Sequence, residues 1–437
     1  MRIVAPIFLL LSLNLVIVAD EGWNQFRGSV GGRLPVVEHP LEWAEDSNIA
    51  WAVPMKGSGW SSPLVLGDRI YLTSAVSEGG DRPKGMAAGV ASMRSFRNAK
   101  PDKHDFNVSC YDLNTGEELW SKTVGEMVPP VVHPSNTYAT ESPATDGERI
   151  ITLFATTGTL VGWDPDGNEL WRQELGNYKS GNGFGTGSSL AILDNRVFVQ
   201  FDNDENSFVA AYNTETGEQL WRNDRPGKTS WSTPMIWEHS GRKELVTCGS
   251  DVVTAYDPAD GTVVWQLSGM KSGFSGSPAI DADRIYFGTS GPMSAGPLVA
   301  VKAGTEGEIE LDRNFESEKV AWSRTRSGPG MASPVVANGH LFITGSSGIL
   351  NCYDTETGER VYKKRVSDMK TVVASLWADE ERVFILDENG TTHVIAAGPE
   401  FNVLGTNQID DLVWSTPTVA GDSLIIRGVE KLYCIRQ

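Results

Sequence analysis

The chain has 437 residues, of which 40% are hydrophobic and 21% are charged, and this composition excludes an intrinsically disordered protein. Its 56 acidic and 37 basic side chains give a net charge of −19, so the protein as a whole repels nucleic acids and anionic membrane surfaces. The 46 glycines and 14 tryptophans indicate many turns and a repeated packing role for one aromatic side chain.

The first residues have the pattern of a secretory signal peptide. Arg2 supplies a positive charge, residues 3–18 are apolar, and Ala19 ends a plausible cleavage site. We therefore expect a cleaved leader over 1–19, a mature domain over 20–437, and a periplasmic or secreted protein. An uncleaved anchor helix is the alternative, although the apolar stretch is shorter than the ~20 residues that a membrane span needs. No cysteine near the cleavage site offers a lipid attachment point.

Eight copies of a unit of roughly 44 residues follow the leader. Each unit opens with a small polar residue and a Pro or Leu before a β-rich run, as in SSPLVLGDRIYLTS at 61–74. Many units end with two aromatic residues around a glycine turn, as in YDLNTGEELW at 111–120. Two units are lengthened by insertions near 78–107 and 303–319. The aligned Pro or Leu stands at positions 63, 143, 190, 234, 278, 334, 376 and 417.

The strand and turn signals of one unit predict four antiparallel strands, which is one blade of a propeller. The whole chain is therefore predicted to be an all-β, eight-bladed β-propeller. The last unit stops at Gln437 without a fourth strand, whereas NIAWAVP at 48–54 reads as a fourth strand with no blade before it. We expect 48–54 to pair within 415–437 and close the ring, which also removes open sheet edges.

An aromatic residue recurs near the end of the units, and this repetition favours packing between neighbouring blades over ligand stacking. A docked Trp buries roughly 150–250 Å², which makes it a core residue. The predicted docking residues are Trp51, Trp120, Trp171, Trp221, Trp265, Trp322 and Tyr362.

Three of the four cysteines, Cys110, Cys352 and Cys434, stand in the small apolar slot before the aromatic phrase or its equivalent. Equivalent positions on different blades are normally too far apart for a bridge, so no disulfide is predicted. A pair of Cys110 with Cys434 across the closing seam is the exception left open.

Residues just before the aligned Pro or Leu differ between units, and they should begin the innermost strands beside the central channel. If they line one mouth of the channel, three tryptophans and one acid form an aromatic pocket suited to a planar or extended ligand. The alternative is that these tryptophans plug the channel. The candidate ligand-binding residues are Trp60, Glu141, Trp231 and Trp414, with His133, Asn136 and Tyr138 on the rim.

No catalytic residue and no metal ligand set is predicted. The six histidines lack a helical His-Glu spacing, and the chain has no Cys-x-x-Cys motif. The acidic stretch 202–206 lacks the Gly and distal Glu of an EF-hand loop and reads as a solvated turn. The insertion near 78–107 is locally basic and is expected either to dock a partner or to be a mobile loop.

The phrases WNQFRG at 23–28, GWSSPLVLGDRIYLTS at 59–74, HPSNTYATESPATDGERI at 133–150 and AGPEFNVLG at 397–405 resemble the PQQ-like β-propeller repeat. The chain is similar to exported propellers related to the outer-membrane assembly factor BamB, in a branch abundant in planctomycete-type bacteria. Unlike BamB it has no lipidation cysteine, and it lacks the adjacent cysteine pair of quinoprotein alcohol dehydrogenases.

This resemblance implies a non-catalytic binding or scaffold protein of the cell envelope, a monomer with a protein or peptide partner and no cofactor. One alternative is a PQQ-dependent oxidoreductase that holds the quinone, with calcium, in the central channel. Another is a carbohydrate-binding or carbohydrate-cleaving propeller, which the channel aromatics alone suggest.

Overall fold

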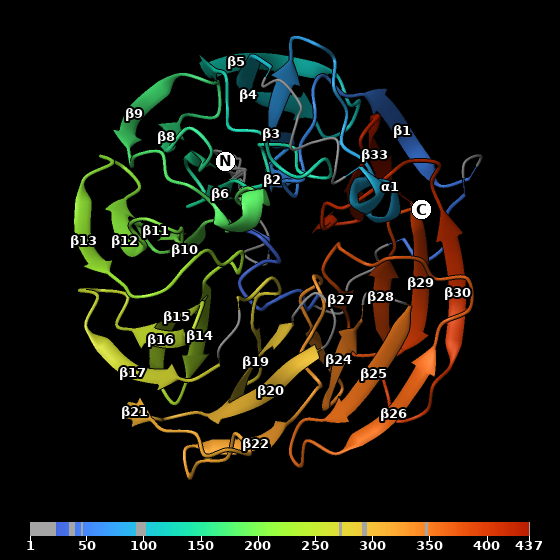
Figure 1. Cartoon of the computed structure of the whole chain (residues 1–437). Coiled ribbons are helices and arrows are strands. Elements are labelled where there is room, and N and C mark those ends of the chain that lie inside the picture. The colour runs from blue at the N-terminus through green and yellow to red at the C-terminus, as the bar shows by residue number, and fades with distance from the viewer. Residues whose placement is uncertain are drawn as a thin grey trace, which may run out of the picture.

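The computed structural model describes residues 23–34, 40–44, 47–92, 102–270, 273–290, 295–345 and 348–436. The predicted signal peptide lies outside these residues. The described residues form eight sheets set around a central axis, which is the predicted eight-bladed, all-β propeller (Figure 1).

The strands of blades 1 to 4 follow one another in chain order from the inner to the outer edge of each antiparallel sheet. Blade 1 contains β2 (Leu64–Leu66), β3 (Arg69–Ser77), β4 (His104–Asp112) and β5 (Glu118–Met127). Blade 2 contains β6 (Ala144–Thr145), β7 (Ile150–Phe154), β8 (Thr159–Trp163) and β9 (Glu169–Glu174). Blade 3 contains β10 (Ala191–Leu193), β11 (Arg196–Phe201), β12 (Phe208–Asn213) and β13 (Gln219–Asp224). Blade 4 contains β14 (Met235–His239), β15 (Arg242–Gly249), β16 (Val252–Tyr256) and β17 (Val263–Ser268).

Blades 5 to 7 repeat this order. Blade 5 contains β18 (Ala279–Ile280), β19 (Arg284–Ser290), β20 (Ala295–Lys302) and β22 (Val320–Arg324). Blade 6 contains β23 (Val335–Ala337), β24 (His340–Thr344), β25 (Ile349–Asp354) and β26 (Arg360–Arg365). Blade 7 contains β27 (Trp377–Ala378), β28 (Arg382–Leu386), β29 (Thr391–Ala396) and β30 (Val403–Gln408).

Blade 8 is shared by the two ends of the chain, as predicted. It contains β31 (Thr418–Ala420), β32 (Ser423–Arg427), β33 (Lys431–Ile435) and, at its outer edge, β1 (Ile49–Pro54). β1 is antiparallel to β33, with Trp51 opposite Cys434 and Val53 opposite Leu432. Because the last strand of the ring comes from the N-terminal part of the chain, backbone pairing joins the two chain ends.

Both predicted insertions hold structure of their own. The first spans 78–103 and contains the short helix α1 (Met86–Ala91), since β3 continues to Ser77 and β4 already begins at His104. The predicted range of 78–107 therefore includes residues of a strand. The second insertion contributes β21 (Gly307–Ile309), which lies parallel to β17 and extends blade 4 to five strands. No helix among the described residues is long and apolar enough to span a membrane.

Five of the recurring aromatic residues link their blade to the next one. Trp171 shows the arrangement: its Nε1 donates to the carbonyl of Thr214 at 2.8 Å, and its ring covers Gly217. A Cβ at Gly217, whose φ is +72°, would lie 2.6 Å from that ring, so both the backbone and the packing require glycine. The same donation to a turn carbonyl of the following blade is made by Trp51, Trp120, Trp221 and Trp322.

Trp265 and Tyr362 depart from this pattern. Trp265 Nε1 donates to Glu244 Oε2 of its own blade at 2.7 Å, while its ring lies in an apolar cluster with Ile285 of blade 5. Here β21 occupies the outer edge beside Trp265, which is fully buried. Tyr362 makes an edge-to-face contact with Phe401 of blade 7, with ring centroids 5.6 Å apart.

A belt of hydroxyl groups surrounds the channel one residue before each aligned Pro or Leu. In blades 1 to 7 the backbone N–H of this residue donates to the hydroxyl of its counterpart in the next blade. The eight residues, from blade 1 to blade 8, are Ser62, Ser142, Ser189, Thr233, Ser277, Ser333, Ser375 and Thr416. At the seam the link is different, because Arg427 of blade 8 donates to Ser61 of blade 1. The repeated Ser or Thr of the sequence is therefore a structural element of the ring.

All four cysteines are buried thiols. Burial raises the pKa of Cys110 to about 12 and that of Cys434 to about 11, so both remain protonated at neutral pH. They pack as small apolar residues, Cys110 in blade 1 and Cys434 beneath the closing strand.

Candidate functional site

An N-terminal segment crosses the centre of the ring. Residues 23–34 lie against the innermost strands of five blades (Figure 1). The Asn24 carbonyl accepts from the backbone N–H of Thr145, and the Gln25 side chain accepts from that of Ile192. Further along, Leu34 donates to the carbonyl of Ala378 in blade 7. This segment, which we call the plug, begins with the WNQFRG phrase.

Arg27 anchors the plug to blades 5 and 6. Its guanidinium is fully buried and donates to the carbonyls of Pro278 and Pro334 as well as to Gly31. Burial lowers the pKa of Arg27 to about 9, so the side chain keeps its charge at neutral pH. The plug contacts lie at or after the aligned Pro or Leu, whereas the predicted ligand-binding residues stand before it.

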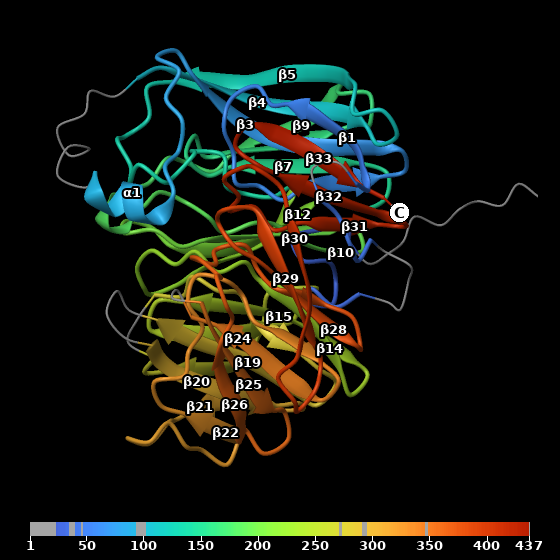
Figure 2. The same cartoon turned by 90° about the vertical axis from the view of Figure 1, so that its right-hand side faces the viewer.

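The predicted rim residues lie on the face that carries α1 and the short 3-10 helix η1 (Gly181–Gly183), nearer the viewer in Figure 1 and to the left in Figure 2. On this face Trp60 and Trp414 meet at the closing seam. Their rings stack at a centroid distance of 5.5 Å and an interplanar angle of 24°. Trp60 Nε1 donates to the carbonyl of Ser135, and Trp414 Nε1 donates to Glu388 Oε2 at 3.2 Å.

The first insertion covers this pair of tryptophans. The backbone N–H of Met86, the first residue of α1, donates to Glu388 Oε2 at 2.8 Å, the same atom that accepts from Trp414. At the other end of the helix a Cβ on Gly89 would lie 2.2 Å from Ser135 Oγ. α1 therefore lies against both residues that accept hydrogen bonds from the stacked pair, Glu388 and Ser135.

Trp231 belongs to a separate aromatic group. Its Nε1 donates to the carbonyl of Gly185 at 2.9 Å, and its ring lies edge-on to Phe184 at 6.1 Å. The ring of His133 lies 5.5 Å from Phe184, and Asn136 Nδ2 donates to the Phe184 carbonyl. Phe184 is 40% exposed although its neighbours hold it in place. We call Phe184, Trp231, His133 and Asn136 the aromatic ledge.

Tyr138 packs against its neighbours and is only partly exposed. The Tyr138 hydroxyl donates to the carbonyl of Pro130, and its ring packs edge-on against His104 at 4.8 Å. Burial raises the pKa of Tyr138 and lowers the pKa of His133, so both are neutral at pH 7. The seven predicted residues are thus divided between a covered seam, the ledge, a packed tyrosine and a buried acid.

That acid, Glu141, is completely buried. Neither carboxylate oxygen forms a well-aligned hydrogen bond with the described residues, and desolvation raises the pKa of Glu141 to about 7. The nearby Thr186 side chain and backbone groups oppose this shift only in part. Buried hydroxyls without a well-aligned hydrogen-bond partner gather in the same part of the chain, at the entries to blades 1 to 3: Ser62, Ser135, Thr137, Thr140, Thr186 and Ser188.

The residues at the channel mouth do not fit a calcium–quinone site. Calcium takes six to eight oxygen ligands, several of them from carboxylates. No group of three or more His, Cys, Asp or Glu side chains in the described part of the chain is placed to hold a metal ion. We therefore derive no redox step at this mouth.

Two contributors to the site were missed by sequence reasoning. Phe184 stands in GNGFGTGSS, where a lone bulky aromatic among glycines could have marked it as an exposed contact. Glu388 lies in the turn between β28 and β29 and carries no such signal. It meets α1 and Trp414 only because distant segments converge at the seam.

Residues 104–268 and 305–402, more than half of the chain, match a protein family described as "Outer membrane protein assembly factor BamB". A curated relative of that name from Shewanella oneidensis is 19% identical over 324 residues, which cover 72% of this chain and 76% of the relative. Two solved structures have the same fold at lower identity. BamB from Moraxella catarrhalis aligns with a TM-score of 0.58 and 13% identity, over 89% of this chain and 99% of that one. The quinohemoprotein alcohol dehydrogenase from Comamonas testosteroni aligns with a TM-score of 0.62 and 11% identity, over 95% and 80%.

Proposed function

Since the chain belongs to the family described as outer membrane protein assembly factor BamB, we propose that it is a non-catalytic binding protein of the cell envelope. It holds a protein or peptide partner on the face that carries α1 and the aromatic ledge. The names of its relatives and the predicted leader over 1–19 support an exported protein that acts near the outer membrane.

The observation that carries this proposal is the exposed apolar surface at the channel mouth. Phe184 is 40% exposed while His133, Asn136 and Trp231 fix its position, so little conformational entropy is lost when a partner covers it. Aromatic residues held in this way are typical anchors of protein interfaces. Val90 of α1 and Met331 before β23 add exposed apolar side chains of 54% and 37%.

Site-specific photocrosslinking in the native cell tests the proposal. A photoreactive phenylalanine at Phe184 should crosslink to a distinct protein partner. The matched control is Leu220 on the outer strand β13, which is also 40% exposed but lies away from the ledge. No adduct from Phe184, or adducts of equal yield and identity from both positions, would contradict the proposed binding face.

A further inference from the structure

The outer strand of blade 7 lacks the docking aromatic that the other seven blades carry. In those blades the aromatic residue pairs with a residue of the third strand just beside a bulge, as Trp171 pairs with Gly162. In blade 7 the same position, opposite Val394 and beside the same bulge, holds Gly405. A Cβ on Gly405 would meet no atom within 4 Å, so the position faces open space.

The turn that receives a docking aromatic is missing from blade 8. In blade 3 this turn joins the third and fourth strands, and it presents the Thr214 carbonyl and Gly217 to Trp171. In blade 8 the third strand is β33 and the fourth is β1, which come from opposite ends of the described chain, so no hairpin turn joins them. Within the described residues, both halves of the repeated docking contact are therefore absent where blade 7 meets blade 8.

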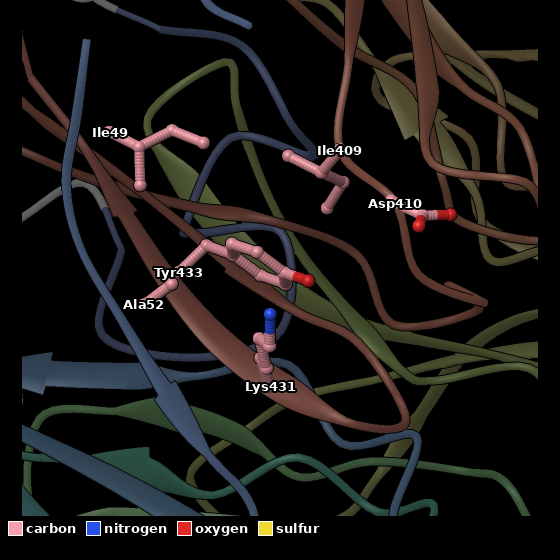
Figure 3. A pocket seen from close by; sticks show the side chains of 6 residues that line it. All are labelled: Ile49, Ala52, Ile409, Asp410, Lys431 and Tyr433. Atoms are coloured by element: carbon pink, nitrogen blue, oxygen red, sulfur yellow. The ribbon is translucent and has the colours of Figure 1, made fainter. Parts of the chain in front are cut away.

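The packing at this joint is incomplete. A depression of about 280 Å³ lies between the two blades (Figure 3). It is lined by β1, β33 and the loop after β30, through Ile49, Ala52, Lys431, Tyr433, Ile409 and Asp410. Side chains that do not meet across an interface lose dispersion contacts, which weakens the joint.

The joint on the other side of blade 8 also departs from the repeat. In blades 1 to 7 the belt residue donates to a hydroxyl of the next blade, whereas the Ser62 hydroxyl of blade 1 has no well-aligned hydrogen-bond partner among the described residues. Arg427 of blade 8 donates to Ser61 instead. Blade 8 is therefore flanked by two joints, each of which lacks one of the repeated contacts.

A segment ahead of β1 supplies an aromatic side chain to the joint with blade 7. Trp43 is 3% exposed, and its backbone N–H donates to Asn407 Oδ1 of β30 at 3.1 Å. Asn407 Nδ2 donates in turn to the carbonyl of Leu41 at 2.9 Å. Trp43 belongs to an apolar cluster that includes Val394 of blade 7 and Val419 of blade 8. The N-terminal part of the chain thus contributes the outer strand of blade 8 and an aromatic residue that the repeat does not place at this joint.

We propose that residues 40–44 and 47–54, which we call the strap, control a local opening of the ring: when the strap detaches, blade 8 opens as one unit while blades 1 to 7 stay folded. Trp43 lies only a few residues before β1. Detachment therefore removes the aromatic residue from the joint with blade 7 and the neighbouring strand from β33 in one step. Units held by fewer contacts open at a lower free energy than the whole fold. This opening concerns the seam alone and is independent of partner binding at the aromatic ledge.

Hydrogen–deuterium exchange of the full chain, measured by mass spectrometry at several denaturant concentrations, tests the proposal. In the unmodified protein the amides of β1, β32 and β33 should exchange through one shared opening. Their exchange should be at least about tenfold faster than that of β11 and β12 in blade 3, the factor that ~1.4 kcal/mol represents. Trp43→Ala should accelerate exchange in blade 8 by a further factor of about ten, and Trp43→Phe, which keeps an aromatic ring, should accelerate it less.

Trp171→Ala, at the complete joint between blades 2 and 3, is the matched control. It should accelerate exchange in blade 3 and leave blade 8 at its unmodified rate, because the open state of blade 8 keeps the contacts of Trp171. Equal protection of blades 3 and 8 in the unmodified chain would overturn the proposal, as would an equal effect of Trp171→Ala on both blades. Unchanged exchange of blade 8 in Trp43→Ala would show that the strap does not control the opening.

Discussion

Glu141 is the one large side chain at a position that the other seven units fill with Ser, Ala or Gly. The small residues fit the narrow space at the start of the innermost strand, and two of them, Ser61 and Ser415, donate to backbone carbonyls of their own blade. Glu141 is fully buried and forms no well-aligned hydrogen bond of this kind. A buried acid with only poorly aligned hydrogen bonds destabilises the folded chain whenever it is ionised.

The destabilisation caused by ionised Glu141 should appear in the pH dependence of the free energy of unfolding. The pKa of Glu141 rises from its ordinary value of 4.5 to about 7 on folding, so the folded state retains the proton longer than the unfolded state. Between these two values stability must fall as pH rises, by up to about 3 kcal/mol at ~1.36 kcal/mol per unit. Glu141→Gln should match the unmodified chain at pH 4 and be more stable at pH 8, as measured by chemical denaturation. Parallel stability curves from pH 4 to 8 would show that Glu141 is not the source.

At the scale of elements, the outer strand of each blade alternates between docked and exposed residues. In β9, Trp171 is 8% exposed and spans the gap to blade 3, whereas its neighbour Leu170 is 48% exposed. A one-residue step along a strand reverses the direction of the side chain, so the strand contributes one side chain to the interface and leaves the next outside. The sequence repeat therefore encodes each blade together with its contact to the following one.

Alanine substitution at these two neighbours separates the roles. Trp171→Ala should lower the free energy of unfolding by about 3–5 kcal/mol, because it leaves a cavity over Gly217 and removes the donor to Thr214. Leu170→Ala, on the same strand, should change it by no more than about 0.5 kcal/mol. Urea denaturation measures both values, and comparable losses from the two variants would refute the docking role of Trp171.

At the scale of the whole molecule, the N-terminal part of the chain holds the ring together twice. The plug contacts five blades from inside the ring, and β1 supplies the outer strand of blade 8. The mouth opposite the plug is partly covered by α1, which reaches from blade 1 to Glu388 of blade 7. A propeller closed in this way presents rigid loops on one face, which suits a scaffold that binds without large rearrangement.

The likeness to a quinohemoprotein dehydrogenase is a likeness of fold, and a cofactor titration separates fold from function. PQQ with excess Ca²⁺ should leave the melting temperature and the absorbance of the purified protein unchanged, since no group of three or more His, Cys, Asp or Glu side chains among the described residues is placed to hold the metal. A quinoprotein apoenzyme treated in parallel serves as the positive control. A saturable rise in melting temperature would show that our interpretation of the channel mouth is wrong.

Much of the fold followed from periodicity, because strands, glycine turns and docking tryptophans recur at a spacing that one blade explains. The sequence also predicted where the ring closes. The strand at 48–54 has no blade before it and the last unit lacks a fourth strand, so the two complete one blade. For the site, the sequence did not reveal how the structure divides the candidate residues. Trp60, Trp231 and Trp414 were grouped because they occupy the same position in their repeats. The loops around them differ in length, and a shared repeat position does not predict which of these loops will cover a residue.

From the sequence alone we predicted four strands in each blade, a docking aromatic residue in seven of the eight blades, and closure of the ring by the two chain ends. The tertiary structure alone decided what is found once. It placed α1 on Glu388, fixed Phe184 on its ledge, and brought Asp411 to the hydroxyl of Tyr433. The repeated contacts lie within one blade or between neighbouring blades, so the residues that make them recur at a fixed spacing in the sequence. The single contacts join segments that meet only when the ring has closed.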